Sequence, residues 1–118
     1  MKFWRPIASI PMALLASQAL AANWVTVGAD KDELSTYVDK DSIRHGSDGL
    51  IYFNTTTDAE EDASRAADCQ KRIDYLLHYD DHLLDHPSNY PDWRDHGDAV
   101  SAGTLGEAEF DYACANAP

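Results

Sequence analysis

The spacing of apolar and polar residues along this chain predicts a domain built mostly of β-strands. Three runs in its first half are rich in β-branched and aromatic residues and are bounded by polar turn signals, which is typical of strands. They cover residues 23–28, 34–39 and 50–56. After the second run, Ile43 is expected to fill the core from a short bend, and Asp48-Gly49 favours a tight hairpin turn. The first half of the domain is therefore predicted to form a sheet.

The pattern is weaker in the second half of the chain. Residues 57–67 are acidic and rich in alanine and serine, which predicts a loop or a short exposed helical turn. Apolar and polar residues then alternate over 68–78, which predicts a long strand. A helix is the alternative there, because five apolar residues would share one helical face: Tyr75, Leu76, Tyr79, Leu83 and Leu84. Residues 86–100 are predicted to be irregular, with Trp93 anchoring them to the body of the domain.

The end of the chain carries the pattern of a helix. Thr104, followed three positions later by Glu107, forms a capping box that satisfies the first free backbone N–H groups. Asn116 and Pro118 are expected to end the helix soon after Cys114. Four residues are expected to face the sheet: Leu105, Ala108, Tyr112 and Ala113. A closing helix packed on the sheet is thus predicted.

The first 21 residues have the layout of a secretory signal peptide. Lys2 and Arg5 give a charged start, residues 7–16 form a short apolar run, and the Ala-Leu-Ala sequence at 19–21 fits the small-x-small cleavage rule. A membrane anchor is the alternative, but the apolar run is too short to span about 30 Å of hydrocarbon. We therefore expect residues 1–21 to be removed.

What remains is a single domain over residues 22–118, with no transmembrane segment expected in it. No cysteine follows the apolar run directly, so the usual bacterial lipid-attachment signal is missing. The predicted localisation is therefore periplasmic or secreted.

Two cysteines, Cys69 and Cys114, stand 45 positions apart. In an oxidising compartment they are able to form a disulfide. Closing a loop of this length removes chain entropy worth about 4 kcal/mol from the unfolded state. Two separate buried thiols are the alternative, and a redox pair is disfavoured because the CxxC spacing is absent.

The chain is strongly acidic, with a formal net charge of −12. Removing Lys2 and Arg5 with the signal peptide leaves 7 basic and 21 acidic residues, a net charge of −14. Such a surface repels nucleic acid and anionic membranes, and it favours basic partners or bound cations. A solvated acidic surface without a ligand is the alternative interpretation.

The most suggestive group of potential metal ligands lies at 78–86. Imidazoles and carboxylates suit zinc and similar metals. On a strand His78, Asp80 and His82 would point to one side. On a helix His78, His82 and His86 would stack at four-residue spacing. The alternative is a hairpin tip with solvent-exposed histidines. A divalent metal site at these four residues is therefore one hypothesis.

No motif of an enzyme is found. The sequence has no nucleophile elbow, phosphate-binding loop or HExxH zinc motif. Aromatic residues are frequent, and exposed ones, with Tyr90 and Trp93 as the main candidates, would suit a protein-binding surface. The sequence thus predicts a non-enzymatic domain with a protein partner.

Taken in order, these motifs resemble the surface-adhesin protein E family of Gram-negative bacteria. The resemblance covers nearly all of the mature chain. It rests on Trp24-Val25-Thr26-Val27-Gly28, the Thr-Tyr-Val-Asp-Lys-Asp-Ser-Ile run at 36–43, Asp68-Cys69 with Arg72 and Tyr75, the Tyr79-Asp80 turn, Trp93, and the Gly103-Thr104 to Glu107 entry into a helix ending in Tyr112-Ala113-Cys114.

The resemblance implies an α+β fold. The expected architecture is a single antiparallel β-sheet of about five or six strands, with a C-terminal helix docked on its concave face by a Cys69–Cys114 bridge. It also implies export to the cell envelope, and the named member is an adhesin for host extracellular-matrix and plasma proteins. This chain departs from an anchored matrix adhesin in lacking a lipid-attachment cysteine and in being acidic.

Two functions follow as hypotheses. The first is an exported, non-enzymatic, adhesin-like domain that contacts proteins of the cell envelope or host matrix. The alternative is a periplasmic metal- or cofactor-binding protein that uses His78, Asp80, His82 and His86.

Overall fold

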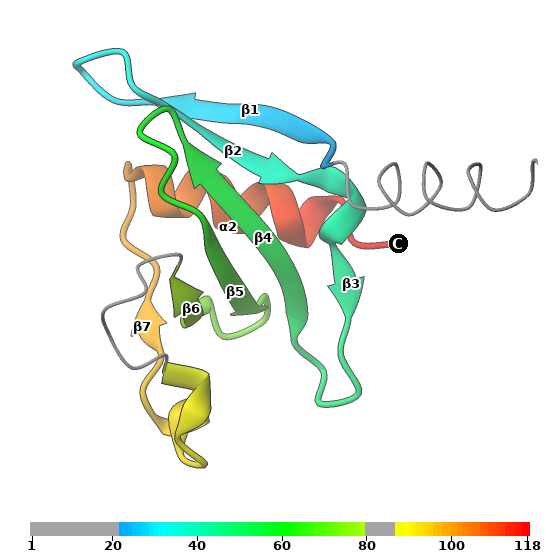
Figure 1. Cartoon of the computed structure of the whole chain (residues 1–118). Coiled ribbons are helices and arrows are strands. Elements are labelled where there is room, and N and C mark those ends of the chain that lie inside the picture. The colour runs from blue at the N-terminus through cyan, green and yellow to red at the C-terminus, as the bar shows by residue number, and fades with distance from the viewer. Residues whose placement is uncertain (1–21, 80–86) are drawn as a thin grey trace, which may run out of the picture.

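One antiparallel β-sheet with helix α2 packed on it makes up the fold (Figure 1). The structure, a computed structural model, describes residues 22–79 and 87–118. The strands are β1 (Trp24–Ala29), β2 (Ser35–Asp39), β3 (Arg44–His45), β4 (Ile51–Thr57), β5 (Ala63–Asp68), β6 (Ile73–Tyr79) and β7 (Asp98–Ala99), and the helix is α2 (Leu105–Ala115). The seven strands follow the order β1-β2-β4-β5-β6-β7, and β3 pairs with β4. The predicted α+β architecture is confirmed.

The predicted signal peptide at 1–21 lies outside the described residues, and so do Asp80, His82 and His86. Within the part of the chain that the structure describes, no helix is both long enough and apolar enough to cross a membrane.

The strands predicted in the first half are confirmed as β1, β2 and β4. The β1–β2 turn is held by the carboxylate of Asp30, which accepts hydrogen bonds from the backbone N–H groups of Asp32 and Leu34. A short 3₁₀ helix follows β2, and Ile43 behind it is buried, as expected. At the β3–β4 turn Gly49 has a φ of 86°, which explains the glycine after Asp48.

The prediction of a loop or helical turn at 57–67 is right for residues 58–62, which connect β4 to β5, and wrong for residues 63–67. Residues 63–67 belong to strand β5, which lies between β4 and β6 in the sheet. Ala66 and Ala67 are fully buried on opposite faces, Ala67 in the core under α2 and Ala66 in a second cluster. Pairing along both edges and burial on both faces override the weak strand propensity of alanine.

Helix α2 begins where the capping box predicts. The hydroxyl oxygen of Thr104 accepts a hydrogen bond from the backbone N–H of Glu107, and the Glu107 carboxylate accepts one from the N–H of Gly103. The four residues expected to face the sheet do so, with Leu105 and Ala108 next to Gly28 of β1 and with Tyr112 and Ala113 at the core, but the prediction missed Phe110. Ala113 is fully buried, but the residue that fills the core is Phe110, 1 % exposed.

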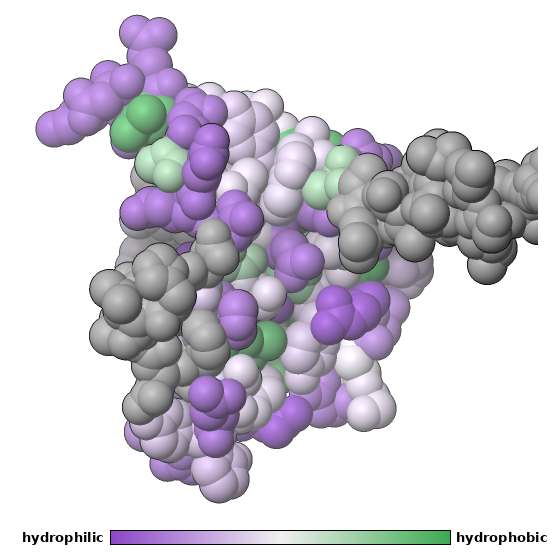
Figure 2. All heavy atoms as spheres, viewed as in Figure 1, coloured by the Kyte–Doolittle hydropathy of each residue, from purple (hydrophilic) through white to green (hydrophobic). Residues whose placement is uncertain are grey.

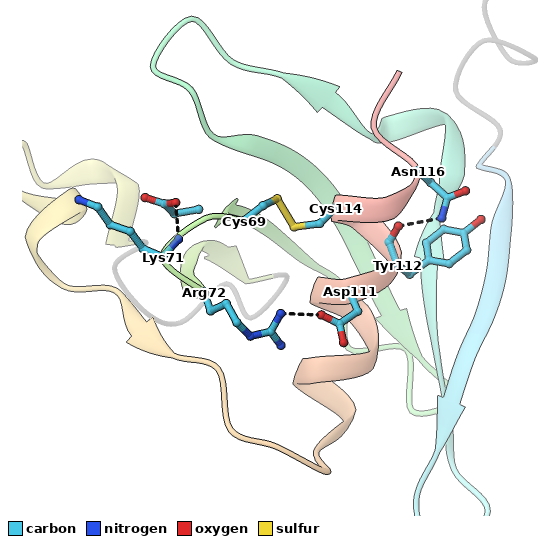
Figure 3. The surroundings of a disulfide bond; sticks show 8 residues. Cys69, Lys71, Arg72, Asp111, Tyr112, Cys114 and Asn116 are labelled. Carbon is cyan, nitrogen blue, oxygen red and sulfur yellow. Dashed lines mark hydrogen bonds and ion pairs between the residues drawn. A yellow bond between two sulfur atoms is a disulfide. The ribbon is translucent and has the colours of Figure 1, made fainter.

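The disulfide between Cys69 and Cys114 is confirmed, with a Cα–Cα distance of 5.9 Å (Figure 3). Cys69 directly follows β5 and lies in the turn before β6, so the strand predicted from position 68 begins later, at Ile73. In this turn Arg72 has a φ of 55° and its guanidinium reaches Asp111 on the helix at 3.0 Å. Bridge and ion pair together fasten the turn to α2.

The face of the sheet opposite α2 has a smaller core of its own. Leu50, Ala66 and Leu77 form it. The segment 87–96, which contains the short 3₁₀ helices Pro87–Asn89 and Trp93–Asp95, lies beside it. The stretch 86–100, predicted to be irregular, also contains strand β7. Its Trp93 ring meets Tyr75 edge to face, with centroids 5.5 Å apart, and so anchors the segment as expected. We call this side of the sheet the helix-free face.

Candidate functional site

Of the four residues of the predicted metal site, the structure describes only His78. His78 lies near the end of β6 and is exposed, whereas its three proposed partners fall outside the described residues. Among the residues that are described, no three His, Cys, Asp or Glu side chains come together to hold a metal ion. The metal site at 78–86 therefore stays a prediction.

A shallow groove of about 250 Å³ lies on the helix-free face. Its lining comes from five strands and from the short segments that flank β1 and β5: Ala22, Trp24, Asp39, Asn54, Thr55, Asp62, Ala63, Ser64 and His78. We call it the Trp24 groove. Figure 2, seen from the same side as Figure 1, shows mostly polar and weakly polar side chains on this face, with apolar ones in small separate patches.

The pairing register explains why these polar side chains meet. Asn54 pairs with Ser64, and Ser64 pairs with His78, so the three form a row across β4, β5 and β6. Their neighbours along β4, Phe53 and Thr55, are buried toward the helix. Because side chains alternate along a strand, the row points away from α2. Trp24 is paired with Asp39 at one end of the hairpin β1–β2 and completes the groove.

The two carboxylates of the groove are held in place by the chain around them. One oxygen of Asp39 accepts hydrogen bonds from the backbone N–H groups of Asn23 and Asp41, at 2.9 and 3.1 Å. One oxygen of Asp62 accepts a hydrogen bond from the Thr56 hydroxyl. No described residue donates a hydrogen bond to the second oxygen, Oδ2, of either. These two oxygens are thus fixed acceptors at the groove.

The groove also offers a hydrogen-bonding pair and an aromatic surface. The Ser64 hydroxyl donates to the Asn54 side-chain oxygen at 3.1 Å, which fixes the orientation of the amide. The Trp24 side chain is 41 % exposed, unusual for so large an apolar group. None of the described lining residues is a lysine or arginine. This chemistry suits a cationic group with several N–H donors.

A second polar cluster is buried between α2 and the sheet. Glu109 of the helix accepts a hydrogen bond from the Thr36 hydroxyl and lies 3.7 Å from the guanidinium of Arg65. Arg65 also pairs with Asp74 at 2.9 Å. Burial raises the pKa of both carboxyl groups, and the positive charge of Arg65 offsets this only in part. One guanidinium serves two carboxylates, so the cluster positions α2 at an electrostatic cost.

A third cluster fastens the segment 87–96 to the β3–β4 turn. Asp48 accepts hydrogen bonds from the Tyr52 hydroxyl at 2.5 Å and the Arg94 guanidinium at 2.8 Å. Burial acts to raise the pKa of Asp48, but these two hydrogen bonds, a third from the backbone N–H of Leu50 and the charge of Arg94 together outweigh it and lower the pKa to about 2. The cluster therefore helps to hold Trp93 against the helix-free face of the sheet.

The sequence predictions did not include the groove. The sequence pattern places Trp24, Asp39 and Asn54 in predicted strands, and Asp62 and Ser64 in a predicted loop or helical turn. Of the two aromatic candidates for an exposed binding surface, Tyr90 is 49 % exposed, whereas Trp93 is partly buried against Tyr75. The groove could have been predicted only if residues 63–68 had been predicted to form a strand between β4 and β6.

No family model matches this chain, and neither a curated protein nor a solved structure was found that matches it. The resemblance to the surface-adhesin protein E family therefore stays a prediction that rests on the sequence motifs alone.

Proposed function

We propose that this domain is an exported, non-enzymatic, adhesin-like module that holds a protein partner by a basic side chain in the Trp24 groove. The observation that carries the proposal is the exposed Trp24 ring in one groove with two carboxylates, each of which is held by one oxygen while its Oδ2 accepts no hydrogen bond from a described residue. A lysine or arginine stacked on an indole gains a cation–π interaction, and a neighbouring carboxylate adds a charge-assisted hydrogen bond.

The charge of the whole chain supports the same class of partner. A net charge of −12 raises the encounter rate with basic proteins and lowers it with acidic ones. The partner is therefore a protein of the cell envelope or host matrix that exposes a basic segment. The Cys69–Cys114 bridge supports export, because structural disulfides persist mainly in oxidising compartments.

A flexible peptide of alternating glycine and arginine, acetylated and amidated at its ends, tests the groove by calorimetry. We expect it to bind the purified protein, and a glycine–glutamate peptide of equal length not to bind. Asp62→Asn and Trp24→Ala should each weaken binding about three- to tenfold. Asp62→Asn keeps an oxygen for the Thr56 hydroxyl, so the local structure is retained.

Asp32→Asn is the matched control, because it removes one negative charge at the opposite end of the β1–β2 hairpin. We expect it to weaken binding less than twofold, since exposed charges beyond about 10 Å are screened. An equal loss in Asp32→Asn and Asp62→Asn would show that the peptide responds to net charge alone, and the groove would be ruled out.

A further inference from the structure

Strand β1 forms one edge of the sheet, and within the described residues its first half lacks the features that usually protect an edge. In the part of the chain that the structure describes, no strand pairs with its outer side. It is six residues long and contains neither proline nor a charged residue. The opposite edge, β7, is only two residues long and begins with Asp98. Natural edge strands are commonly shortened, charged or covered, because an open row of N–H and C=O groups pairs readily with other chains.

The register shows which backbone groups face outward. The backbone N–H of Lys40 donates to the carbonyl of Asn23 at 2.9 Å, so this carbonyl points toward β2. Because hydrogen-bonded and non-hydrogen-bonded pairs alternate in an antiparallel ladder, Val25 also bonds to β2. The N–H and C=O groups of Trp24 and Thr26 then point away from the sheet. A bulge between Thr26 and Gly28 limits the regular edge to this first half of β1.

We propose that the outer edge of β1 is a strand-addition site, which pairs backbone to backbone with an extended basic segment of a partner protein. The backbone groups of Trp24 and Thr26 supply two donors and two acceptors for such a segment. Alternate side chains of the added strand lie next to the exposed Trp24 ring on the helix-free face, where a lysine or arginine is favoured.

The charge of the chain selects this occupant over a second copy of the protein. Two copies would each carry −12 and repel one another as their edges approach. A basic segment is attracted by the same charge. The inference goes beyond the proposed function, because the Trp24 groove binds side chains and the β1 edge binds backbone groups. An experiment is therefore able to rule out binding at one of these two sites without ruling out binding at the other.

The probe is an extended peptide of alternating valine and lysine, with a second version in which every inner backbone nitrogen is methylated. Both carry the same side chains and charge, but the methylated peptide has no inner N–H donors. We expect binding of the first and about tenfold or more weakening for the second, which corresponds to two or so lost hydrogen bonds. On binding, exchange of the Trp24 and Thr26 amide protons should slow in the wild-type protein.

The variant Thr26→Pro tests the same edge by a change in the protein, where the methylated peptide tests it by a change in the ligand. Proline removes the outward N–H of Thr26, and an edge strand tolerates it there. We expect about tenfold weaker binding of the valine–lysine peptide, unchanged binding for Thr26→Val, and unchanged binding of the glycine–arginine peptide to Thr26→Pro. This last result separates the edge from the groove.

Three outcomes measured on the wild-type protein would overturn the inference, and these do not depend on whether Thr26→Pro folds. They are equal binding of the methylated peptide, no binding of either peptide, and unchanged exchange at Trp24 and Thr26. A dimer in analytical ultracentrifugation that Thr26→Pro dissociates would also overturn it, because the occupant of the edge would then be a second copy.

Discussion

The face of the sheet under α2 has the larger apolar core and is cross-linked, whereas the opposite face is polar around the Trp24 groove and has only a small core. On the helix side, Phe110 packs into a continuous core and a disulfide ties the helix end to the β5–β6 turn. On the helix-free face, Trp93 and Asp48 hold the segment 87–96 in place. The difference indicates that stability resides mainly on the helix side, which leaves the other face available for binding.

The largest expected effect comes from breaking the cross-link. Cys114→Ala should lower the free energy of unfolding by about 4 kcal/mol. For a domain of this size the melting temperature should then fall by roughly 15 °C or more. Thermal denaturation followed by circular dichroism measures this fall. The double variant Cys69→Ala/Cys114→Ala should have the same melting temperature as Cys114→Ala alone. A fall of only a degree or two would show that the ion pairs and core hold α2 without the bridge.

A smaller effect is expected from the tryptophans of the helix-free face. Trp93→Ala should destabilise the protein by about 2 kcal/mol, because it removes a partly buried ring packed on Tyr75. Trp24→Ala should change stability by less than about 0.5 kcal/mol, since the ring is exposed. Urea denaturation of both variants compares the two sites. Equal losses would mean that Trp24 belongs to the core and not to a binding groove.

The effect of Asp48 on stability should be smaller than that of Trp93, and it should depend on pH in the acid range. Because its folded-state pKa is lowered from 3.8 to about 2, its contribution is complete above the unfolded-state value and is lost as the pH falls toward 2. The side chain is partly exposed, so we expect about 1 kcal/mol for Asp48→Asn near neutral pH. This difference should shrink in the acid range, whereas Asp95→Asn, an exposed neighbour, should show no difference at either pH. A constant difference for Asp48→Asn would contradict the lowered pKa.

Glu109→Gln should produce the smallest change, with the opposite sign. The raised pKa of Glu109 means that its charged form is disfavoured in the folded state, so the penalty is present above the folded pKa and disappears as the pH falls below the usual value of 4.5. The amide is able to donate to the Thr36 hydroxyl, which itself bonds the Thr56 carbonyl. We expect a melting temperature a few degrees higher near neutral pH, measured by calorimetry, and little gain in acid.

Glu107→Gln is the control for Glu109→Gln, because it makes the same chemical change two positions earlier on α2. Glu107 caps the helix through Gly103 and pairs with Arg72, so its loss of charge should leave stability unchanged or slightly lower. If Glu109→Gln were the more destabilising of the two, the buried cluster would be a net source of stability.

Much of the fold could be predicted because it depends on local chemistry. The β-branched runs of β1, β2 and β4 and the Thr104 capping box each act within a few residues. The pairing of Cys69 with Cys114 required no choice between partners, because the sequence holds two cysteines. The groove could not be predicted, because its residues come from five strands and depend on how those strands pair.

The sequence by itself therefore determined which segments extend, where the closing helix begins and how the chain is cross-linked. Tertiary structure decided three other matters: that the alanine-rich segment at 63–68 is an inner strand, that Glu109 is buried, and that Trp24, Asp39 and Asp62 line one groove. The physical reason is that propensity and capping are properties of neighbouring residues. Burial and register are instead set by contacts between segments far apart in the chain.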